Sequence, residues 1–239
     1  MIALSSAFLV VLVIIGLMLW QPWRSDPFSL PTDTQTARPT GSQWNELDPT
    51  ETPTDPDPEG DGGRPVECPM GEDNFDLPPQ GSYYVSGDVE YEGVPDWNDG
   101  GGWTIDFASE RSGQMDRVGG NWVSITAIGQ LDKDDYGPNP RAAANQIIQC
   151  MSSSYYYHTL SHREGLEDQA FSTSDGLEGW LIRENFWNVP GEYVTGDEVV
   201  VVVIDDGSET LTLFHTQAPI EDDKRKKKVA AALDSLGRR

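Results

Sequence analysis

The sequence predicts an α+β domain in which an antiparallel sheet packs against two helices, preceded by a transmembrane helix and a disordered linker. Two long segments, 177–189 and 197–204, have the residues and the alternation of β-strands. Between the second segment and the apolar residues after it stands Asp205-Asp206-Gly207-Ser208, a tight hairpin signal that makes these strands antiparallel neighbours. Helical patterns near residue 140 and at the C-terminus carry apolar stripes that would cover the sheet.

The first half of the domain predicts shorter strands. Residues 83–90 alternate weakly and are expected to form an edge strand. Residues 103–107 and 121–128 alternate between apolar and polar side chains, which is typical of strands with one buried face. These segments are expected to join the same sheet.

The two helices are predicted from their first residues and their apolar spacing. Asn139 is expected to cap the first helix and Pro140 to occupy its first turn. Its apolar stripe consists of Ala143, Ala144, Ile147, Ile148 and Met151. The acids at 221–223 favour the start of the last helix, since they lie at the positive end of its dipole. Its apolar stripe consists of Val229, Ala232, Leu233 and Leu236.

A run of five valines, 199–203, predicts the centre of the sheet. An amphipathic edge strand would alternate, whereas a continuous β-branched run is expected where both faces of a strand are buried. The helices should therefore cover this strand.

The segment Ile2–Trp20 contains no charged residue and is long enough to cross roughly 30 Å of hydrocarbon. We expect a transmembrane anchor over residues 1–22, a Pro/Thr/Asp-rich disordered linker over 23–65 and an extracytoplasmic domain over 66–239. A cleavable signal peptide and a buried core helix are the alternatives. Arg24 opposes export by the positive-inside rule, but the linker composition and the two cysteines favour it. The predicted location is the cell membrane, with a single pass and the C-terminal domain outside.

Composition and motifs exclude several functions. A formal net charge of −24 argues against nucleic acid as a partner, because the phosphate backbone requires a positive surface. None of the three histidines lies in a zinc-protease motif, and no nucleophile elbow is present. We therefore expect no catalytic, cofactor-binding or metal-binding residues. An envelope hydrolase with an unrecognised active site is the alternative.

Cys68 and Cys150 are the only cysteines, and both fall in the predicted folded part. In an oxidising compartment they are expected to form a disulfide that ties the start of the domain to the first helix. Two buried thiols are the alternative.

The block from 139 to 236 resembles the small domain of the PsbP-like class. The resemblance rests on element order and hydrophobic pattern, seen in the Asn-Pro-capped helix, Gly176-Leu-Glu-Gly179-Trp180, the acid-flanked strand 199–203 and the helix after Ala218-Pro219-Ile220. That class includes photosystem accessory proteins, a Ran-binding nuclear transport factor and actinobacterial envelope lipoproteins. The tethered acidic layout is similar to actinobacterial membrane proteins of that type. The resemblance implies a non-catalytic accessory role in binding an envelope protein or glycan.

The aromatic residues supply candidate contacts for such a partner. Trp97 lies in a glycine-rich turn, and Tyr155, Tyr156 and Tyr157 follow the first helix in a Ser-rich segment. Trp and Tyr bury a large area at low entropic cost, which makes them frequent interface anchors. We expect these four residues to contact the partner. Packing of the rings in the core is the alternative.

Overall fold

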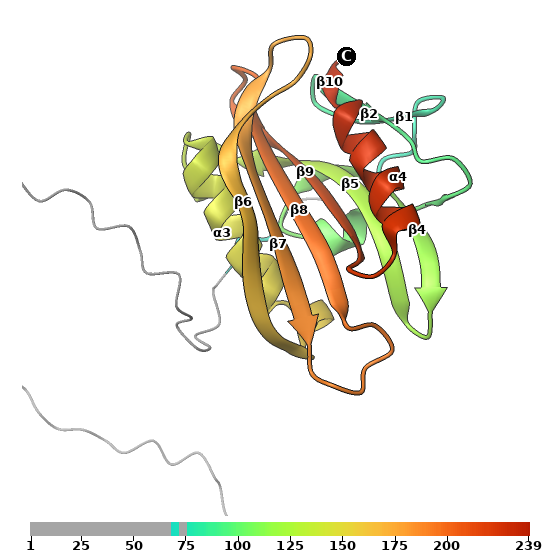
Figure 1. Ribbon diagram of the computed structural model, residues 1–239. Helices are drawn as coiled ribbons and strands as arrows, with labels where there is room; N and C mark the ends of the chain where they lie inside the picture. The colour runs from blue at the N-terminus through green and yellow to red at the C-terminus, as the bar shows by residue number, and fades with distance from the viewer. Residues whose placement is uncertain (1–67, 72–75) are drawn as a thin grey trace, which may run out of the picture. The chain divides into compact units, whose positions relative to one another are not determined.

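The computed structural model describes residues 68–71 and 76–239, and its main feature is a seven-stranded sheet (Figure 1). Its strand order is β3-β4-β5-β9-β8-β7-β6, and each neighbouring pair is antiparallel. The strands are β3 (Asn98–Asp99), β4 (Ser109–Gly119), β5 (Trp122–Asp132), β6 (Leu160–Ser172), β7 (Glu178–Asn188), β8 (Gly196–Asp205) and β9 (Thr210–Pro219). The fold is α+β, as predicted.

A second, three-stranded sheet has the order β1-β2-β10 and consists of β1 (Tyr83–Ser86), β2 (Val89–Glu92) and β10 (Gly237–Arg238). The helical elements are η1 (Gly102–Ile105), α2 (Lys133–Tyr136), α3 (Pro140–Ser153), η2 (Tyr155–Tyr157) and α4 (Asp223–Asp234). In Figure 1, α3 and α4 lie on opposite sides of the large sheet. The domain is therefore built as a sheet between two covering layers.

The five valines of β8 lie at the centre of this arrangement, which confirms the predicted central strand. Val199, Val201 and Val203 belong to the apolar cluster under α3. Val200 and Val202 belong to the cluster under α4. Because successive side chains of a strand point to opposite faces, the run contributes to both halves of the core.

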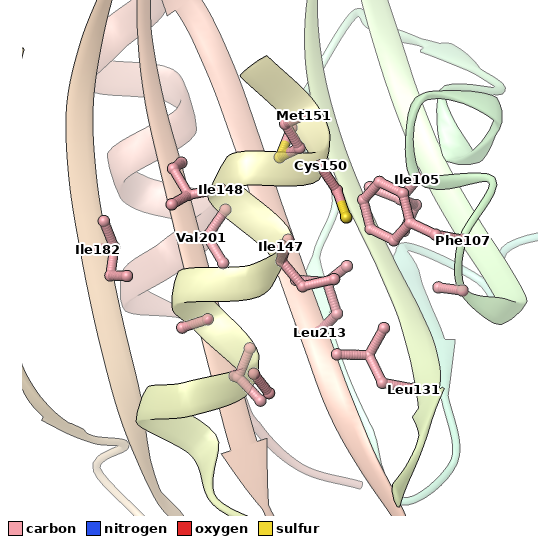
Figure 2. Close-up of a cluster of buried hydrophobic side chains, with 14 of the residues drawn as sticks. Ile105, Phe107, Leu131, Ile147, Ile148, Cys150, Met151, Ile182, Val201 and Leu213 are labelled. Atoms are coloured by element: carbon pink, nitrogen blue, oxygen red, sulfur yellow. The ribbon is translucent and has the colours of Figure 1, made fainter. Parts of the chain in front are cut away.

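The helix α3 follows from its sequence. The side-chain oxygen of Asn139 accepts hydrogen bonds from the backbone N–H groups of Arg141 and Ala142, at 2.9 Å and 3.2 Å. Pro140 occupies the first turn, where its missing N–H costs no hydrogen bond. Ile147 and Ile148 point from α3 onto the sheet, where Val201 and Leu213 lie (Figure 2). The apolar stripe predicted from the sequence is buried.

The opposite face of the sheet is covered by α4 and the small sheet. Val229, Ala232 and Leu233 are the buried residues of α4. Beside them Tyr91 of β2 packs its ring edge-on against Phe214, with ring centroids 5.1 Å apart. The Tyr91 hydroxyl donates to the carbonyl oxygen of Thr126 at 3.1 Å, so its polar end is also satisfied.

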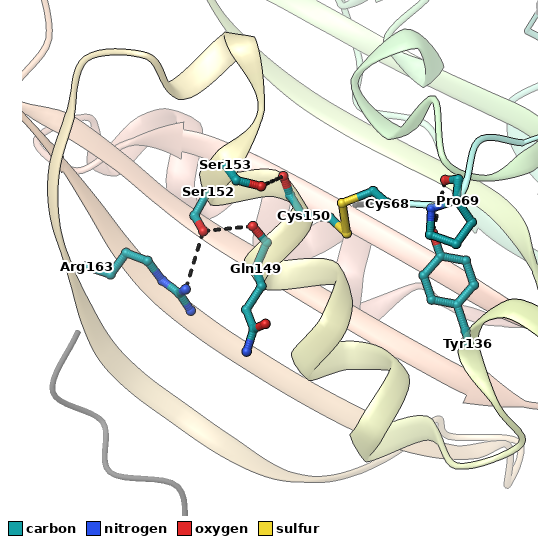
Figure 3. The surroundings of a disulfide bond; sticks show 8 residues. All are labelled: Cys68, Pro69, Tyr136, Gln149, Cys150, Ser152, Ser153 and Arg163. Carbon is teal, nitrogen blue, oxygen red and sulfur yellow. Dashed lines mark hydrogen bonds between the residues drawn. A yellow bond between two sulfur atoms is a disulfide. The ribbon is translucent and has the colours of Figure 1, made fainter. Parts of the chain in front are cut away.

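A disulfide joins Cys68 to Cys150, which confirms the predicted pairing (Figure 3). Their Cα atoms are 5.8 Å apart although 82 positions separate them in the chain. The neighbouring residues are tied down as well, since Gly71 donates its N–H to the carbonyl oxygen of Asp106 at 2.9 Å. The disulfide therefore fastens the start of the described domain to the C-terminal end of α3.

One strand prediction is wrong, and a second is only partly right. Residues 103–107 do not form a strand: 102–105 make the short helix η1, in which Thr104 and Ile105 are buried and Trp103 is exposed. Both the backbone N–H and the hydroxyl of Thr104 donate to the carbonyl oxygen of Gly101, whose φ of 141° turns the chain. Residues 83–90 were expected to form one edge strand. Strand β1 is an edge strand, but it belongs to the small sheet, and a turn separates it from its partner β2.

Strands β4 and β6 were not predicted, because both are rich in polar residues. In β4, buried polar side chains bond to backbone groups: Ser112 donates its hydroxyl to the carbonyl oxygen of Leu77 at 3.0 Å. Strand β6 forms one edge of the sheet, and most of its side chains are exposed. Exposed charged residues are typical of edge strands, which gain nothing from a hydrophobic alternation.

The predicted anchor over 1–22 and linker over 23–65 lie outside the described residues, as do positions 66 and 67 of the predicted domain. Within 68–71 and 76–239, none of the helices combines the length and the apolar character that a bilayer crossing requires.

The close pairing of β7 with β8 predicts different effects for two glycines. A Cβ atom on Gly179 would lie 2.3 Å from the carbonyl oxygen of Val203, whereas one on Gly165 in β6 would meet nothing within 4 Å. We expect Gly179→Ala to lower the free energy of unfolding by about 1–3 kcal/mol, as overpacking does. Gly165→Ala should stay within about 0.5 kcal/mol of the wild type. Urea denaturation measures both, and equal losses would contradict this packing of β7 on β8.

Candidate functional site

A cavity of about 200 Å³ opens where η1, the start of β5, the segment after α3 and the ends of β8 and β9 converge. We call it the aromatic pocket. Most of its lining is apolar and aromatic, with a few polar groups, which is the usual composition of a ligand site. Its lining residues are Trp103, Thr104, Asn121, Trp122, Val123, Met151, Ser154, Tyr155, Tyr156, Tyr157, His158, Asp197 and Gln217.

The mouth of the pocket is formed by rings that remain in contact with solvent. Tyr155, Tyr156 and Trp103 are 82%, 43% and 37% exposed. The Trp103 and Tyr156 rings meet edge-on with centroids 4.9 Å apart, and Tyr155 stacks on the His158 ring at 5.3 Å. These contacts give a continuous aromatic rim.

The way α3 ends places the three tyrosines. Ser154 has an extended backbone with ψ of 160°, and its N–H donates to the carbonyl oxygen of Met151 at 3.1 Å. The chain then turns through η2, in which Tyr157 is buried while Tyr155 and Tyr156 are exposed. Two tyrosines therefore form the rim, and the third joins the wall.

Asp197 lies near the start of β8 and lines the pocket together with Trp122. The indole Nε1–H of Trp122 donates to both carboxyl oxygens of Asp197, at 3.0 Å and 2.9 Å. Asp197 is only 1% exposed, and none of the ion pairs found in the described part of the chain includes it. Burial raises the pKa of Asp197 to about 7, although the Trp122 hydrogen bond acts in the opposite direction.

Tyr157 and Gln217 also line the pocket. The Tyr157 hydroxyl donates to Oε1 of Gln217 at 2.8 Å, and Nε2 of Gln217 donates to the carbonyl oxygen of Val123 at 3.1 Å. Burial, and then the nearby Asp197 carboxylate, raise the pKa of Tyr157 well above its ordinary value. Tyr157 is therefore a neutral hydrogen-bond donor, and its ring packs edge-on against Phe186 at 4.8 Å.

The four predicted contact residues separate into two groups. Tyr155 and Tyr156 lie at the mouth of the aromatic pocket, whereas Tyr157 is 6% exposed and Trp97 is 8% exposed. Trp97 belongs to the apolar cluster under α4, and we correct its assignment to the surface. The turn folds inward because the amide side chain of Gln114 bonds both backbone groups of Val94, at 2.6 Å and 3.1 Å.

Asp197, Trp122 and Gln217 were not predicted as site residues. An acid just before a β-branched run is an ordinary way to begin a strand, so Asp197 had no distinguishing signal. Trp122 was expected in a strand, and it does begin β5, but its bond to Asp197 joins positions 75 residues apart. Only the pairing of β8 with β9 and of β9 with β5 brings these residues together.

A second cavity, of about 560 Å³, lies between the β1–β2 turn, α2 and the β8–β9 turn. Its lining includes Asp88, Asp132, Asp135 and Asp206. No group of three or more His, Cys, Asp or Glu residues in the described ranges is arranged to hold a metal ion. The aromatic pocket differs from this cavity in combining apolar walls with a buried carboxyl group.

The buried carboxyl of Asp197 makes stability depend on pH. Its pKa of about 7 lies above the ordinary value, so between about pH 4 and pH 7 the folded protein holds a proton that the unfolded chain has released. The free energy of unfolding should fall as pH rises through this window, by up to about 4 kcal/mol. Asp197→Asn should lack this fall, and its advantage over the wild type should be larger at pH 8 than at pH 4.

Thermal or urea unfolding of both proteins at the two pH values measures this difference. Asp234→Asn, at an exposed position on α4, is the matched control and should change by less than about 0.5 kcal/mol at either pH. An Asp197→Asn effect that is the same at pH 4 and pH 8 would contradict a buried, uncompensated carboxyl.

No protein-family model matches the chain, and no curated protein matches it. The chain is similar to the crystal structure of the Saccharomyces cerevisiae Ran-binding protein Mog1p, with 10% sequence identity, a TM-score of 0.41 and coverage of 64% of this chain and 93% of that one. It is also similar to a mutant of protein Mog1, with 10% identity, a TM-score of 0.40 and coverage of 64% and 94%. Because both TM-scores are below 0.5, we base no functional assignment on either likeness.

Proposed function

We propose that this chain is a non-catalytic accessory domain of the PsbP-like class, tethered to a membrane and acting outside the cytoplasm in an actinobacterial-type envelope. It binds an envelope protein or glycan through the mouth of the aromatic pocket. Residues 2–20 supply the tether, because their uncharged apolar sequence suits a bilayer.

The exposed rings at the mouth of the pocket are the observation that carries the proposal. Tyr155 and Tyr156 protrude beside Trp103, and their exposed fractions of 82% and 43% are high for large side chains. These rings contact one another and His158, and none of the three is buried in the core. Rigid Tyr and Trp side chains next to a pocket are typical anchors of a binding surface.

The disulfide supports the extracytoplasmic location. Disulfides such as Cys68–Cys150 persist in oxidising compartments and are rare in the cytosol. The bond also holds the end of α3, from which η2 and the rim tyrosines follow. Oxidation therefore supports the geometry of the proposed binding surface as well as the stability of the domain.

An envelope hydrolase is the second candidate, and Asp197 is the observation that favours it. A carboxyl in a cleft with a pKa of about 7 has the properties of a general acid. The accessory-domain proposal gives Asp197 no catalytic role. Turnover of an envelope polymer by the wild type, lost in Asp197→Asn, would favour the hydrolase and contradict the binding-only proposal.

The binding proposal predicts that partner capture depends on the rim. We expect a Tyr155→Ala/Tyr156→Ala double variant to recover at least about tenfold less partner from native membranes, since interface anchors contribute on the order of 1–2 kcal/mol or more each. Crosslinking followed by affinity purification of the full chain measures recovery.

Tyr83→Ala is the matched control, because Tyr83 is 40% exposed but lies on β1 and outside the aromatic pocket. It should capture the partner as well as the wild type does. Equal recovery by the double variant and the control, with both proteins folded, would show that the rim is not the binding surface.

A further inference from the structure

We infer that the aromatic pocket binds an alkylammonium group, with the rings of the pocket against the cation and the Asp197 carboxylate as its countercharge. This inference goes beyond the proposed function, since it assigns a small ligand to the interior of the pocket whose mouth is proposed to contact the partner. It depends on three features of the pocket: an uncompensated buried carboxyl, aromatic walls and a small volume.

The carboxyl of Asp197 lacks a cationic partner. A single N–H, that of Trp122, is shared between its two oxygens at 3.0 Å and 2.9 Å, and it forms no ion pair with any residue of the described ranges. A buried carboxylate with so little compensation is costly, and a cation bound nearby reduces that cost. Because Asp197 lines the pocket, a cation held there lies close to its charge.

The walls offer aromatic surfaces to such a cation. Trp103, Trp122, Tyr155 and Tyr156 all line the pocket. A cation within about 6 Å of a ring centroid is attracted to the ring face, most strongly for Trp, and quaternary ammonium groups are recognised in this way. The Trp122 indole donates a hydrogen bond to the Asp197 carboxylate, which polarises the indole and makes its ring face more negative. A more negative ring face attracts a cation more strongly.

The volume limits the size of the ligand. A cavity of about 200 Å³ is smaller than the roughly 300–1,000 Å³ of sites for drug-sized ligands. It suits a compact head such as trimethylammonium, with the remainder of the molecule leaving at the exposed mouth of the pocket. The net charge of −24 also attracts cations to the protein.

Isothermal titration of the full chain in a nonionic detergent at pH 8, above the pKa of about 7 of Asp197, tests the inference. The probes are choline and its uncharged carbon analogue, in which tert-butyl replaces trimethylammonium. We expect saturable choline binding and at least roughly tenfold weaker binding of the analogue, within the range that a desolvated cation–π contact supports. This comparison needs no variant and therefore does not depend on how a substitution affects folding.

Variants then assign the effect to named residues. Asp197→Asn keeps the shape of the side chain and removes its charge, so choline affinity should fall at least roughly tenfold, close to that of the analogue. Trp103→Ala should weaken choline roughly two- to thirtyfold. Tyr83→Ala should bind choline as the wild type does, because Tyr83 does not line the pocket.

Glycerophosphocholine distinguishes the source of the ammonium group. Binding as tight as that of choline supports a lipid headgroup, and much weaker binding supports a free small molecule. Absence of choline binding, equal binding of the uncharged analogue, or unchanged affinity in Asp197→Asn would overturn the inference. The proposed function would then still be judged by partner capture with the rim variant, so the two can fail separately.

Discussion

The burial of β8 on both faces is the constraint on which the rest of the domain depends. A strand with Val199, Val201 and Val203 on one face and Val200 and Val202 on the other cannot lie at a solvated surface. Each buried valine contributes about 1.5–3 kcal/mol relative to exposure, so both covering layers are needed. Helix α3 supplies one layer, and α4 with the small sheet supplies the other.

The aromatic pocket lies where α3 ends and aromatic side chains cover the sheet in its place. Helix α3 ends at Ser153, and the segment that follows it lines the same cavity as Asp197, the second residue of β8. Aromatic side chains from η1, η2 and the start of β5 cover the polar end of β8 in place of aliphatic ones. The rings exclude water from Asp197, and this exclusion produces its raised pKa. The same residues therefore close the core and form the site.

The sequence was most informative where a segment carried a single strong pattern. The valine run, the hairpin after Asp205 and the Asn139 cap each have one physical interpretation, and the structure has all three. The strand predicted over 103–107 was wrong, because alternation over a few residues does not distinguish a strand from a short helix in which one residue, Trp103, is exposed. Strands β4 and β6 were missed because side-chain hydrogen bonds in β4 and edge exposure in β6 replace apolar patterning.

The site was less predictable than the fold, since it depends on contacts between distant positions. Tyr155 and Tyr156 were recognisable from their place after a helix, and they do reach the rim. Asp197 and Trp122 can be recognised as site residues only from the hydrogen bond between them. That bond depends on the register of β5, β9 and β8, which the sequence does not specify. Trp97 was predicted at the surface from its glycine-rich turn, but it is buried. The side chain of Gln114 bonds to the backbone of Val94 and holds that turn against the core.

The central claim is that a buried carboxyl, bonded to the Trp122 indole and to no cation of the described chain, lies under the aromatic pocket. A pH titration of the Trp122 indole N–H resonance by NMR tests it most directly, with Asp197→Asn to assign the signal. We expect this resonance to shift with a midpoint of about pH 7, and we expect the shift to be absent from the variant. A resonance that does not respond to Asp197, or a midpoint of about 4 as for a solvated aspartate, would contradict it.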